Sequence, residues 1–169
     1  LGADVAGLAV GQRVMAVSSW GGLAEFVCAP AGKVSPIPQT MPFEEASALL
    51  VTYCTAWHAL KARASLQPGE TLLVLGASGG VGLAAIELGK ALGATVVAAA
   101  SSPEKLAAAR ESGADATVLY PTGELTTEQR KELTAAFKEA CGPRGASVVF
   151  DPVGGLYSEP AFRAIGWGG

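Results

Sequence analysis

The chain has 169 residues, of which 50% are hydrophobic and 16% charged, and its formal net charge is −3. This composition can fill a hydrophobic core, whereas the dispersed Lys and Arg disfavour nucleic acid as a partner, and no apolar run is long enough to predict a membrane partner. The three cysteines form no CxxC pair, which disfavours a structural zinc site or a disulfide framework and favours a reducing compartment. The expected location is cytoplasmic, with an organelle as the open alternative.

Residues 1–42 have the character of a β domain. GQRVMAV (11–17) is a turn followed by an apolar strand, and GGLAEFVCAP (21–30) begins with a Gly-Gly turn and alternates loosely. KVSPIPQTMP (33–42) contains three prolines, which suits an extended segment. Because the sequence starts without Met and stops where another strand is expected, we expect a piece of a larger protein.

A long helix is predicted over residues 43–64. Glu44 and Glu45 would lie in its first turn, and Lys61 and Arg63 near its end, which matches the polarity of the helix dipole. We therefore place a domain boundary between residues 42 and 43, with a second domain over 43–169.

Strands and helices alternate from residue 71 onward. The strands are predicted at 71–77, 94–100, 116–120 and from 146; the helices between them are predicted at 80–93, 102–113 and 126–142, with another starting near 158. Continuously apolar strands joined by helices are typical of a parallel sheet with right-handed crossovers. The predicted fold class is α/β, with a doubly wound (Rossmann) parallel sheet that is incomplete.

Capping residues mark two of these helices. Ser102 is a predicted N-cap with Pro103 at the first helical position, and Gly113 closes the same helix. For the helix that follows, Thr126 and Thr127 are both plausible caps.

The glycine-rich stretch GASGGVG, residues 76–82, joins the first of these strands to its helix. A loop in this place lies at the carboxyl edge of a parallel sheet, where the free N–H groups and the dipole of a helix N-terminus bind phosphate. Its glycines follow the spacing Gly76-x-x-Gly79-x-x-Gly82, which is neither GxGxxG nor a P-loop. We predict a dinucleotide pyrophosphate site, the alternative being a close-packed turn without a ligand.

The end of the next strand indicates which dinucleotide binds. NAD sites carry Asp or Glu there, but this sequence has AAASSPEK, residues 98–105, with no carboxylate at the strand tip. Ser101 and Ser102 offer hydroxyls and Lys105 offers a cation, which suits a 2′-phosphate. NADPH is therefore the predicted cofactor. Alternatively, Ser102 is a helix cap and Lys105 is solvated surface; for Ser102 both interpretations can hold together.

Several segments resemble the medium-chain dehydrogenase/reductase superfamily and, within it, the zinc-free quinone oxidoreductase (zeta-crystallin-like) group. They occur in family order and spacing: VGQRVMAV, GGLAEFV, FEEASALLVTYCTAWHAL, LQPGETLLVLGASGGVGLAAIELGKALGATVVAAASSPEKLAAARESGAD and VVFDPVGG. The resemblance implies that residues 1–42 are the C-terminal part of a GroES-like catalytic domain. Residues 43–169 would then be a Rossmann domain that lacks its last strands.

The resemblance also implies chemistry without zinc. GQRVMAV passes almost directly to SSWGGLAEF, which leaves no room for the Cys-rich lobe of the zinc enzymes. Val51 stands where those enzymes have a zinc-binding cysteine, and valine cannot bind a metal. Cys54 is three positions further along the chain, on another helix face. No metal-binding residue is assigned.

Cofactor-binding residues are carried over from the family one position at a time. The resulting set is Thr55, His58, Gly79, Gly80, Val81, Ser101, Ser102, Lys105, Tyr120, Asp151 and Pro152. Thr55 would lie near the nicotinamide. His58 would line the cofactor cleft, although the family often has tyrosine there, and a helix-surface histidine is the alternative.

The other members of this set fall into four groups. Ser101, Ser102 and Lys105 match the 2′-phosphate pocket of the family. The Gly80 and Val81 amides would contact the pyrophosphate, and Tyr120 would lie near the 2′-phosphate and the adenosine. From the sequence by itself, Tyr120 is a strand-end aromatic without a role. Asp151 and Pro152 would run beside the cofactor, with hydrogen bonds from Asp151 to loop amides as an equal alternative.

The reaction implied is hydride transfer from NADPH to a small electrophile, either a quinone or an α,β-unsaturated carbonyl. No proton donor or other catalytic residue can be named, and we expect the 169-residue piece to be inactive by itself. A homodimer paired edge to edge is expected, through a strand beyond Gly169.

Other functions stay open at this point. An enoyl reductase of the same superfamily shares the fold and the zinc-free chemistry, while Val51 disfavours a zinc-type alcohol dehydrogenase. A short-chain dehydrogenase is disfavoured because Tyr53, Tyr120 and Tyr157 all lack the lysine of YxxxK. The non-enzymatic alternative is a cofactor-binding, crystallin-like structural protein, with RNA binding as a side activity.

Overall fold

A computed structural model describes residues 1–169, which form two compact units, Leu1–Leu50 and Val51–Gly169. The sequence placed the boundary at residue 43, the first residue of helix α1 (Phe43–Trp57). The division between the units falls within α1, so residues 43–50 of the helix belong to the N-terminal unit and residues 51–57 to the larger unit.

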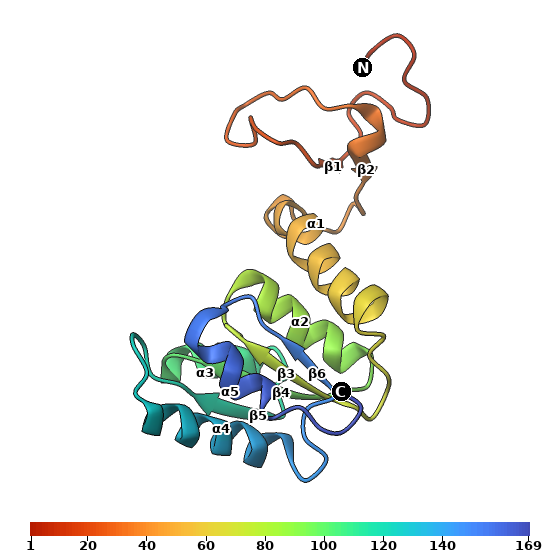
Figure 1. Cartoon of the computed structure of the whole chain (residues 1–169). Helices are drawn as coiled ribbons and strands as arrows, with labels where there is room; N and C mark the ends of the chain where they lie inside the picture. Colours follow the sequence, from red (N-terminus) through yellow and green to blue (C-terminus); the bar gives the residue numbers. More distant parts are fainter. The chain divides into compact units, whose positions relative to one another are not determined.

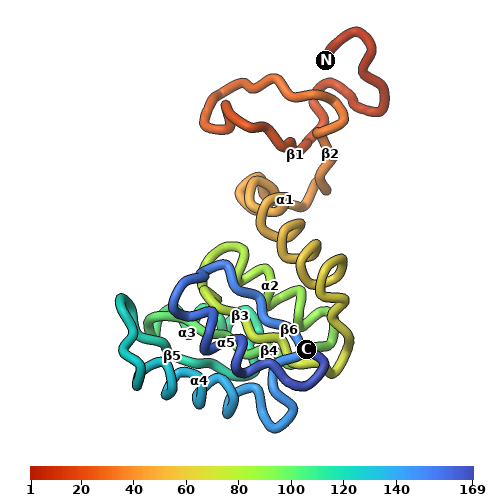
Figure 2. The backbone as a smooth tube through the Cα atoms, in the orientation of Figure 1, coloured from red at the N-terminus to blue at the C-terminus, as the bar shows by residue number.

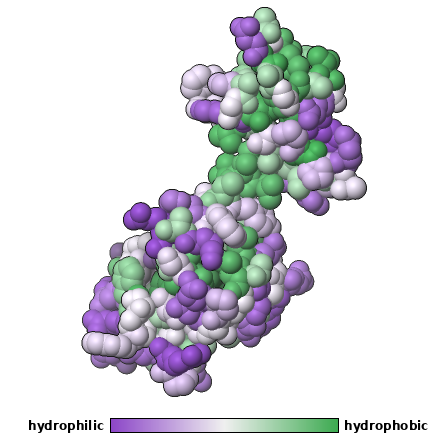
Figure 3. Space-filling model, turned by 90° about the vertical axis from the view of Figure 1, so that its right-hand side faces the viewer, coloured by the Kyte–Doolittle hydropathy of each residue, from purple (hydrophilic) through white to green (hydrophobic).

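The N-terminal unit contains one small sheet. Strand β1 (Val14–Ala16) pairs antiparallel with β2 (Val34–Pro36), which follows the 3-10 turn η1 (Ala31–Lys33). The β character predicted for residues 21–30 is wrong, because this segment forms no strand. Its large side chains have no sheet face to cover: Leu23 and Phe26 are fully or almost fully exposed, and apolar surface gathers on this unit in Figure 3.

Helix α1 passes at its end into a π-helical stretch, η2 (His58–Arg63). The charges lie as predicted, with the acidic pair in the first turn of α1 and the basic pair in the last turn of η2. Ala56 and Leu60 are fully buried on the side that packs on the sheet domain. The Tyr53 hydroxyl donates a hydrogen bond to the Glu87 carboxylate, which fixes this part of α1 against α2.

The larger unit is built on a four-stranded, wholly parallel sheet (Figure 1). Its strands are β3 (Thr71–Leu75), β4 (Thr95–Ala100), β5 (Ala116–Leu119) and β6 (Val148–Phe150). They lie in the order β5-β4-β3-β6, so the chain moves outward from β3 in one direction and then returns to its other side. This order change confirms the doubly wound α/β prediction.

Helices cover both faces of this sheet. They are α2 (Gly80–Ala91), α3 (Pro103–Glu111), α4 (Thr127–Cys141) and α5 (Ser158–Phe162), the last preceded by the 3-10 turn η3 (Gly155–Tyr157). Leu72 and Val74 point to a core shared with α2 and α3, whereas Leu73 and Leu75 point to a core shared with α4 and α5. None of the helices is long and apolar enough to cross a membrane.

The predicted caps form. The Lys105 amide donates to the Ser102 hydroxyl over 3.3 Å, and Pro103 is the first helical residue of α3. Between Thr126 and Thr127 the structure selects Thr126, which forms a reciprocal capping box with Gln129.

Asp115 ties the start of β5 to two neighbouring elements. Its carboxylate accepts hydrogen bonds from Lys90 Nζ on α2 at 2.7 Å and from the Val96 amide on β4 at 2.7 Å. Burial raises the pKa of this carboxyl, but the Lys90 hydrogen bond and charge and the Val96 amide outweigh that effect. The pKa of Asp115 is therefore held below its ordinary value of 3.8.

We expect Asp115→Asn to lower the free energy of unfolding near neutral pH by about 0.5–1 kcal/mol, as for a half-exposed ion pair. A depressed folded-state pKa stabilises the fold above the unfolded pKa, and this contribution is lost as the pH falls through the folded value. The difference between variant and wild type should therefore be constant above about pH 5 and shrink below pH 3.8. Urea unfolding across this pH range measures it, and a difference independent of pH would contradict the prediction.

Candidate functional site

The carboxyl ends of the four parallel strands bring separate segments to one edge of the sheet. The strand register pairs Leu75 with Ala99, Ala100 with Leu119, and Val74 with Phe150. The residues that follow these strands therefore lie along the same edge, as Figure 2 traces for the turn from β3 into α2. Four of the predicted site segments meet here: 76–82, 101–105, 120 and 151–152.

The glycine loop presents free backbone donors at the start of α2. Gly79 is the N-cap of the helix, in an extended conformation and without a side-chain cap. The first helical hydrogen bond runs from the Leu83 amide to the Gly79 carbonyl at 2.8 Å, so the N–H groups of Gly80, Val81 and Gly82 have no backbone acceptor. Gly79 and Gly80 are exposed. This is the arrangement that binds an anion at a helix N-terminus.

The glycines of the loop are needed for different reasons. A Cβ on Gly82 would lie 2.4 Å from the Gly76 carbonyl oxygen and 2.9 Å from the Ala77 Cα, so this residue permits close packing of α2 on the end of β3. A Cβ on Gly79 would meet its nearest atom at an ordinary 3.4 Å. The alternative of a close-packed turn thus describes Gly82, and the exposed Gly79 and Gly80 form the part that a ligand can approach.

The segment after β4 forms a small polar cluster. Lys105 Nζ donates to the Ser101 hydroxyl at 3.0 Å, so the cation and this serine already lie together. Ser102 acts as the cap of α3, and its hydroxyl also donates to the Glu104 carboxylate. This hydrogen bond holds the pKa of Glu104 below its usual value. Glu104 was not among the predicted site residues, although an acid two residues after an N-cap serine was a visible signal.

The predicted residues of α1 and η2 are less closely connected to this edge. Thr55 and His58 are both exposed, and neither has a hydrogen bond or ion pair that links it to the glycine loop. Thr52 is the nearer residue: its Cγ2 lies 3.2 Å from the position that a Cβ on Gly80 would take. Thr52 was not among the predicted site residues, because a threonine in a helical sequence gives no sign of which helix face it occupies.

Tyr120, directly after β5, is buried, with 6% of its surface exposed. Its ring lies 4.8 Å from that of Tyr157. Burial raises the pKa of the Tyr120 hydroxyl, and a hydrogen bond from the backbone of Gly76 partly opposes this.

Asp151 shapes the turn after β6. Its Oδ1 accepts hydrogen bonds from the amides of Val153 at 2.9 Å and Gly154 at 2.8 Å, and its Oδ2 accepts one from the Ser158 hydroxyl at 2.5 Å. The carboxylate thus bonds to loop amides, which was the alternative interpretation. Pro152 and Val153 pack where a Cβ on Gly76 would otherwise lie.

Comparison with known proteins identifies the family. Residues 80–169 match the family model described as "Zinc-binding dehydrogenase". Quinone oxidoreductase-like protein 2 of Bos taurus is 40% identical over 99% of this chain and 46% of its own length. A mycobacterial protein solved as a complex with NADPH has a TM-score of 0.86 and 29% identity, over 98% of this chain and 50% of that one. The enoyl reductase CurK has a TM-score of 0.81 and 29% identity, over 98% and 47%.

The chain belongs to the medium-chain dehydrogenase/reductase superfamily, in its quinone oxidoreductase group. This confirms the resemblance drawn from the sequence motifs. The chain spans less than half of the length of the quinone oxidoreductase-like relatives that it matches.

Val51 and Cys54 are the two residues on which the prediction about zinc depends, and both are exposed on α1. The description of the matched family names zinc, whereas the valine led us to predict chemistry without it. The described residues gather no group of three or more His, Cys, Asp or Glu side chains. Zinc independence stays a prediction.

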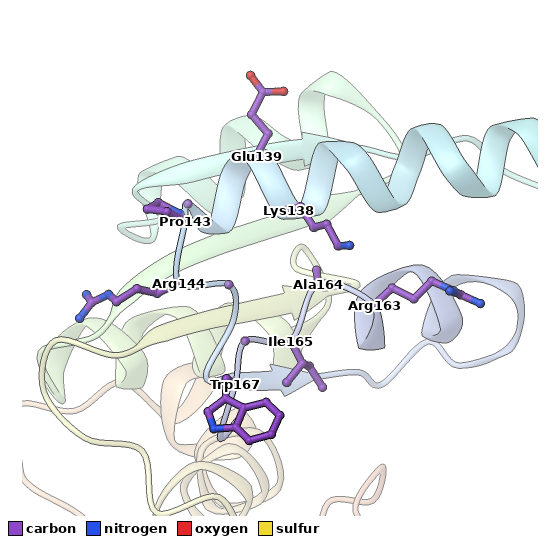
Figure 4. A pocket seen from close by; sticks show the side chains of 11 residues that line it. Lys138, Glu139, Pro143, Arg144, Arg163, Ala164, Ile165 and Trp167 are labelled. Carbon is purple, nitrogen blue, oxygen red and sulfur yellow. The ribbon is translucent and has the colours of Figure 1, made fainter.

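A large hollow of about 620 Å³ lies elsewhere on the dehydrogenase fold (Figure 4). Lys138, Arg144, Arg163 and Trp167 are among its lining residues, and the Glu139 carboxylate points away from it. It lies at the amino-terminal edge of the sheet, beside the Ala146–Ile165 bridge that begins a further parallel pairing next to β6. The hollow is thus at the opposite edge from the glycine loop and is no part of the candidate site.

Proposed function

We propose that this chain carries the dinucleotide-binding region of an NADPH-dependent oxidoreductase. In this proposal the enzyme passes hydride to a small electrophile, a quinone or an α,β-unsaturated carbonyl, and needs no zinc. The observation that carries the proposal is the exposed, uncapped start of α2 at Gly79 and Gly80, which lies on the same sheet edge as Ser101 and Lys105.

Two parts of this sheet edge, the start of α2 and the cluster after β4, suit the pyrophosphate and the 2′-phosphate of the cofactor. The free N–H groups of Gly80 and Val81 offer donors, and the dipole of α2 favours an anion, so a pyrophosphate fits there. The Lys105 ammonium and the Ser101 and Ser102 hydroxyls offer a cation and two polar groups to a 2′-phosphate. Both subsites come from the ends of adjacent strands, as in other doubly wound folds.

The Glu104 carboxylate weakens the expected preference for NADPH over NADH. Its carboxylate is hydrogen-bonded to Ser102 and, with its lowered pKa, is charged at neutral pH. A 2′-phosphate has to approach with this negative charge nearby, whereas a ribose 2′-hydroxyl can donate to it. We infer that NADPH is preferred through Lys105 and that Glu104 reduces the margin over NADH.

The bound nicotinamide would supply the hydride, and the protein would supply orientation and a hydrophobic setting. Thr55 and His58 remain the proposed residues for the nicotinamide end, on the exposed face of α1 and η2. The described residues give no basis for naming a proton donor. We also propose that the intact protein is a homodimer.

An enoyl reductase is the second candidate, favoured by the structural similarity to CurK over nearly the whole chain. The two functions share the fold and the hydride donor, and they differ in the acceptor. Activity with a free quinone or enone and inactivity with an enoyl thioester would support the first candidate, and the reverse result the second.

The proposal is tested by titrating NADPH and NADH into the intact protein and following the fluorescence of the bound reduced cofactor. We expect tighter binding of NADPH, turnover with a quinone or an enone, and full activity after zinc is removed with a chelator. NADH binding as tight as or tighter than NADPH would overturn the assignment of Ser101, Ser102 and Lys105. Loss of turnover on chelation, with recovery when zinc is added, would overturn the zinc-free mechanism.

A further inference from the structure

Helix α1 contacts the first residue of α2, where the proposed pyrophosphate seat begins. Thr52 Cγ2 lies 3.2 Å from the position that a Cβ on Gly80 would take, and no side chain outside the adjacent residues comes closer to that position. Thr52 is half-buried, whereas Gly80 is exposed. The methyl group of Thr52 therefore packs on one side of the Gly80 backbone, and the other side stays open to a ligand.

This part of α1 is fixed by two further contacts. The hydroxyl of Tyr53, the next residue, donates a hydrogen bond to the Glu87 carboxylate on α2. Ala56, one turn further along α1, is fully buried in the hydrophobic cluster to which α2 contributes. Glu87 follows Gly80 by seven residues, so both lie on one face of α2. Thr52 is thus held against Gly80 by the packing of the two helices along their length.

We propose that Thr52 is a positioning residue for the pyrophosphate seat and that it acts through its methyl group, not through its hydroxyl. This inference rests on the proposed function. The N–H groups of Gly80 and Val81 bind an anion well only when they point to one place, so the direction of the first turn of α2 decides the affinity. That turn has no side-chain cap, and the Thr52 methyl group limits its movement toward α1.

The same contact explains why position 80 is a glycine. Gly80 is not among the glycines with a positive φ, so its backbone conformation is open to any residue. A Cβ at this position would be only 3.2 Å from Thr52 Cγ2, closer than packed carbon atoms prefer, so one of the two helices would have to shift. Removing the Thr52 methyl group should therefore make alanine acceptable at position 80.

The test separates the two groups of the threonine with a matched pair of variants of the intact protein. Thr52→Ser removes the methyl group and keeps the hydroxyl, whereas Thr52→Val keeps the methyl group and removes the hydroxyl. Serine, threonine and valine have similar helix propensities. In Thr52→Ser we expect the dissociation constant for NADPH to rise about 3- to 10-fold, the size expected for the loss of one packed methyl group. In Thr52→Val it should stay within about twofold of wild type.

Two readouts distinguish positioning from a general loss of stability. In Thr52→Ser the KM for NADPH should rise while kcat stays unchanged, because the seat binds the pyrophosphate equally in the ground state and the transition state. Asp115→Asn, which breaks the ion pair with Lys90 on α2, should lower stability and leave NADPH affinity unchanged. Weaker NADPH binding in Thr52→Val than in Thr52→Ser would assign the effect to the hydroxyl and overturn the inference. Wild-type affinity in both variants would overturn it as well.

Thermal unfolding without any ligand tests the contact independently of the proposed function. Gly80→Ala should lower the Tm by about 3 °C in the wild-type background. In the Thr52→Ser background it should leave the Tm unchanged or raise it, because alanine favours a helix more than glycine does once there is space. Wild-type protein that binds no NADPH would overturn the proposed function, and this rescue would still support Thr52 as the residue that fixes the start of α2. An equal effect of Gly80→Ala in both backgrounds would overturn the contact and the inference with it.

Discussion

Replacing Gly82 with alanine is expected to abolish cofactor binding and to lower the free energy of unfolding by about 3 kcal/mol, the upper end of the usual cost of overpacking. The added Cβ would lie 2.4 Å from the Gly76 carbonyl oxygen and 2.9 Å from the Ala77 Cα. Both neighbours are backbone atoms of the β3 end, so no side-chain rotation can relieve the contact. Helix α2 has to move away from the strand, and its N–H groups move with it.

Thermal and urea unfolding, together with NADPH titration, measure the two effects in the intact protein. Gly32→Ala is the control, because a Cβ at Gly32 would have no atom within 4 Å. We expect that variant to bind NADPH like the wild type. If Gly82→Ala kept wild-type stability and wild-type NADPH affinity, the close approach of α2 to the β3 end would be refuted.

The sequence predicted the larger unit well because its signals are local and repeated. Continuous apolar runs marked the strands, and caps such as Ser102 and Thr126 marked helix starts to within a residue. Each signal agreed with the next, and strand–helix alternation then left only the parallel, doubly wound arrangement. The glycine loop could be placed at the carboxyl edge by the same argument.

The N-terminal unit was predicted less well for a physical reason. Alternation in residues 21–30 suits a strand only if another strand and a covering layer are present, and in the described chain Leu23 and Phe26 have neither. Strands β1 and β2 do form, because each has the other as a hydrogen-bonded partner. A strand propensity without a partner does not decide structure.

Roles at the site depended on side-chain direction, which the sequence does not carry. Tyr120 was assigned to the cofactor from its place at the end of a strand, and that assignment stays a prediction; its ring contact with Tyr157 could not be predicted from the sequence. Thr52 and Glu104 were missed because their importance comes from what lies opposite them, Gly80 and Ser102 respectively. Residue type and spacing located the edge of the sheet, and only the fold shows which neighbours each of its side chains contacts.

The second large effect is expected on NADPH affinity, at the polar cluster of Ser101, Ser102 and Lys105 after β4. If Lys105 contacts the 2′-phosphate as we propose, Lys105→Ala removes a charge-assisted contact worth about 1.5–3 kcal/mol, so NADPH should bind about 10- to 150-fold more weakly. NADH, which has a hydroxyl at that position, should change by no more than about twofold. Because the contact is exposed to solvent, the preference for NADPH in the wild type should also decrease as salt is raised.

Glu104→Gln provides the opposite change at the same cluster. It removes the negative charge next to Ser102 and keeps a side chain of similar shape that can still accept its hydrogen bond. We expect NADPH to bind about two- to fivefold more tightly, the size expected for relief of an exposed like-charge contact, and NADH to bind no better. If Lys105→Ala lost equal affinity for NADPH and NADH, Lys105 would support the fold of α3 and not the 2′-phosphate. If Glu104→Gln bound NADPH more weakly, this carboxylate would orient Ser102 toward the phosphate instead of repelling the phosphate.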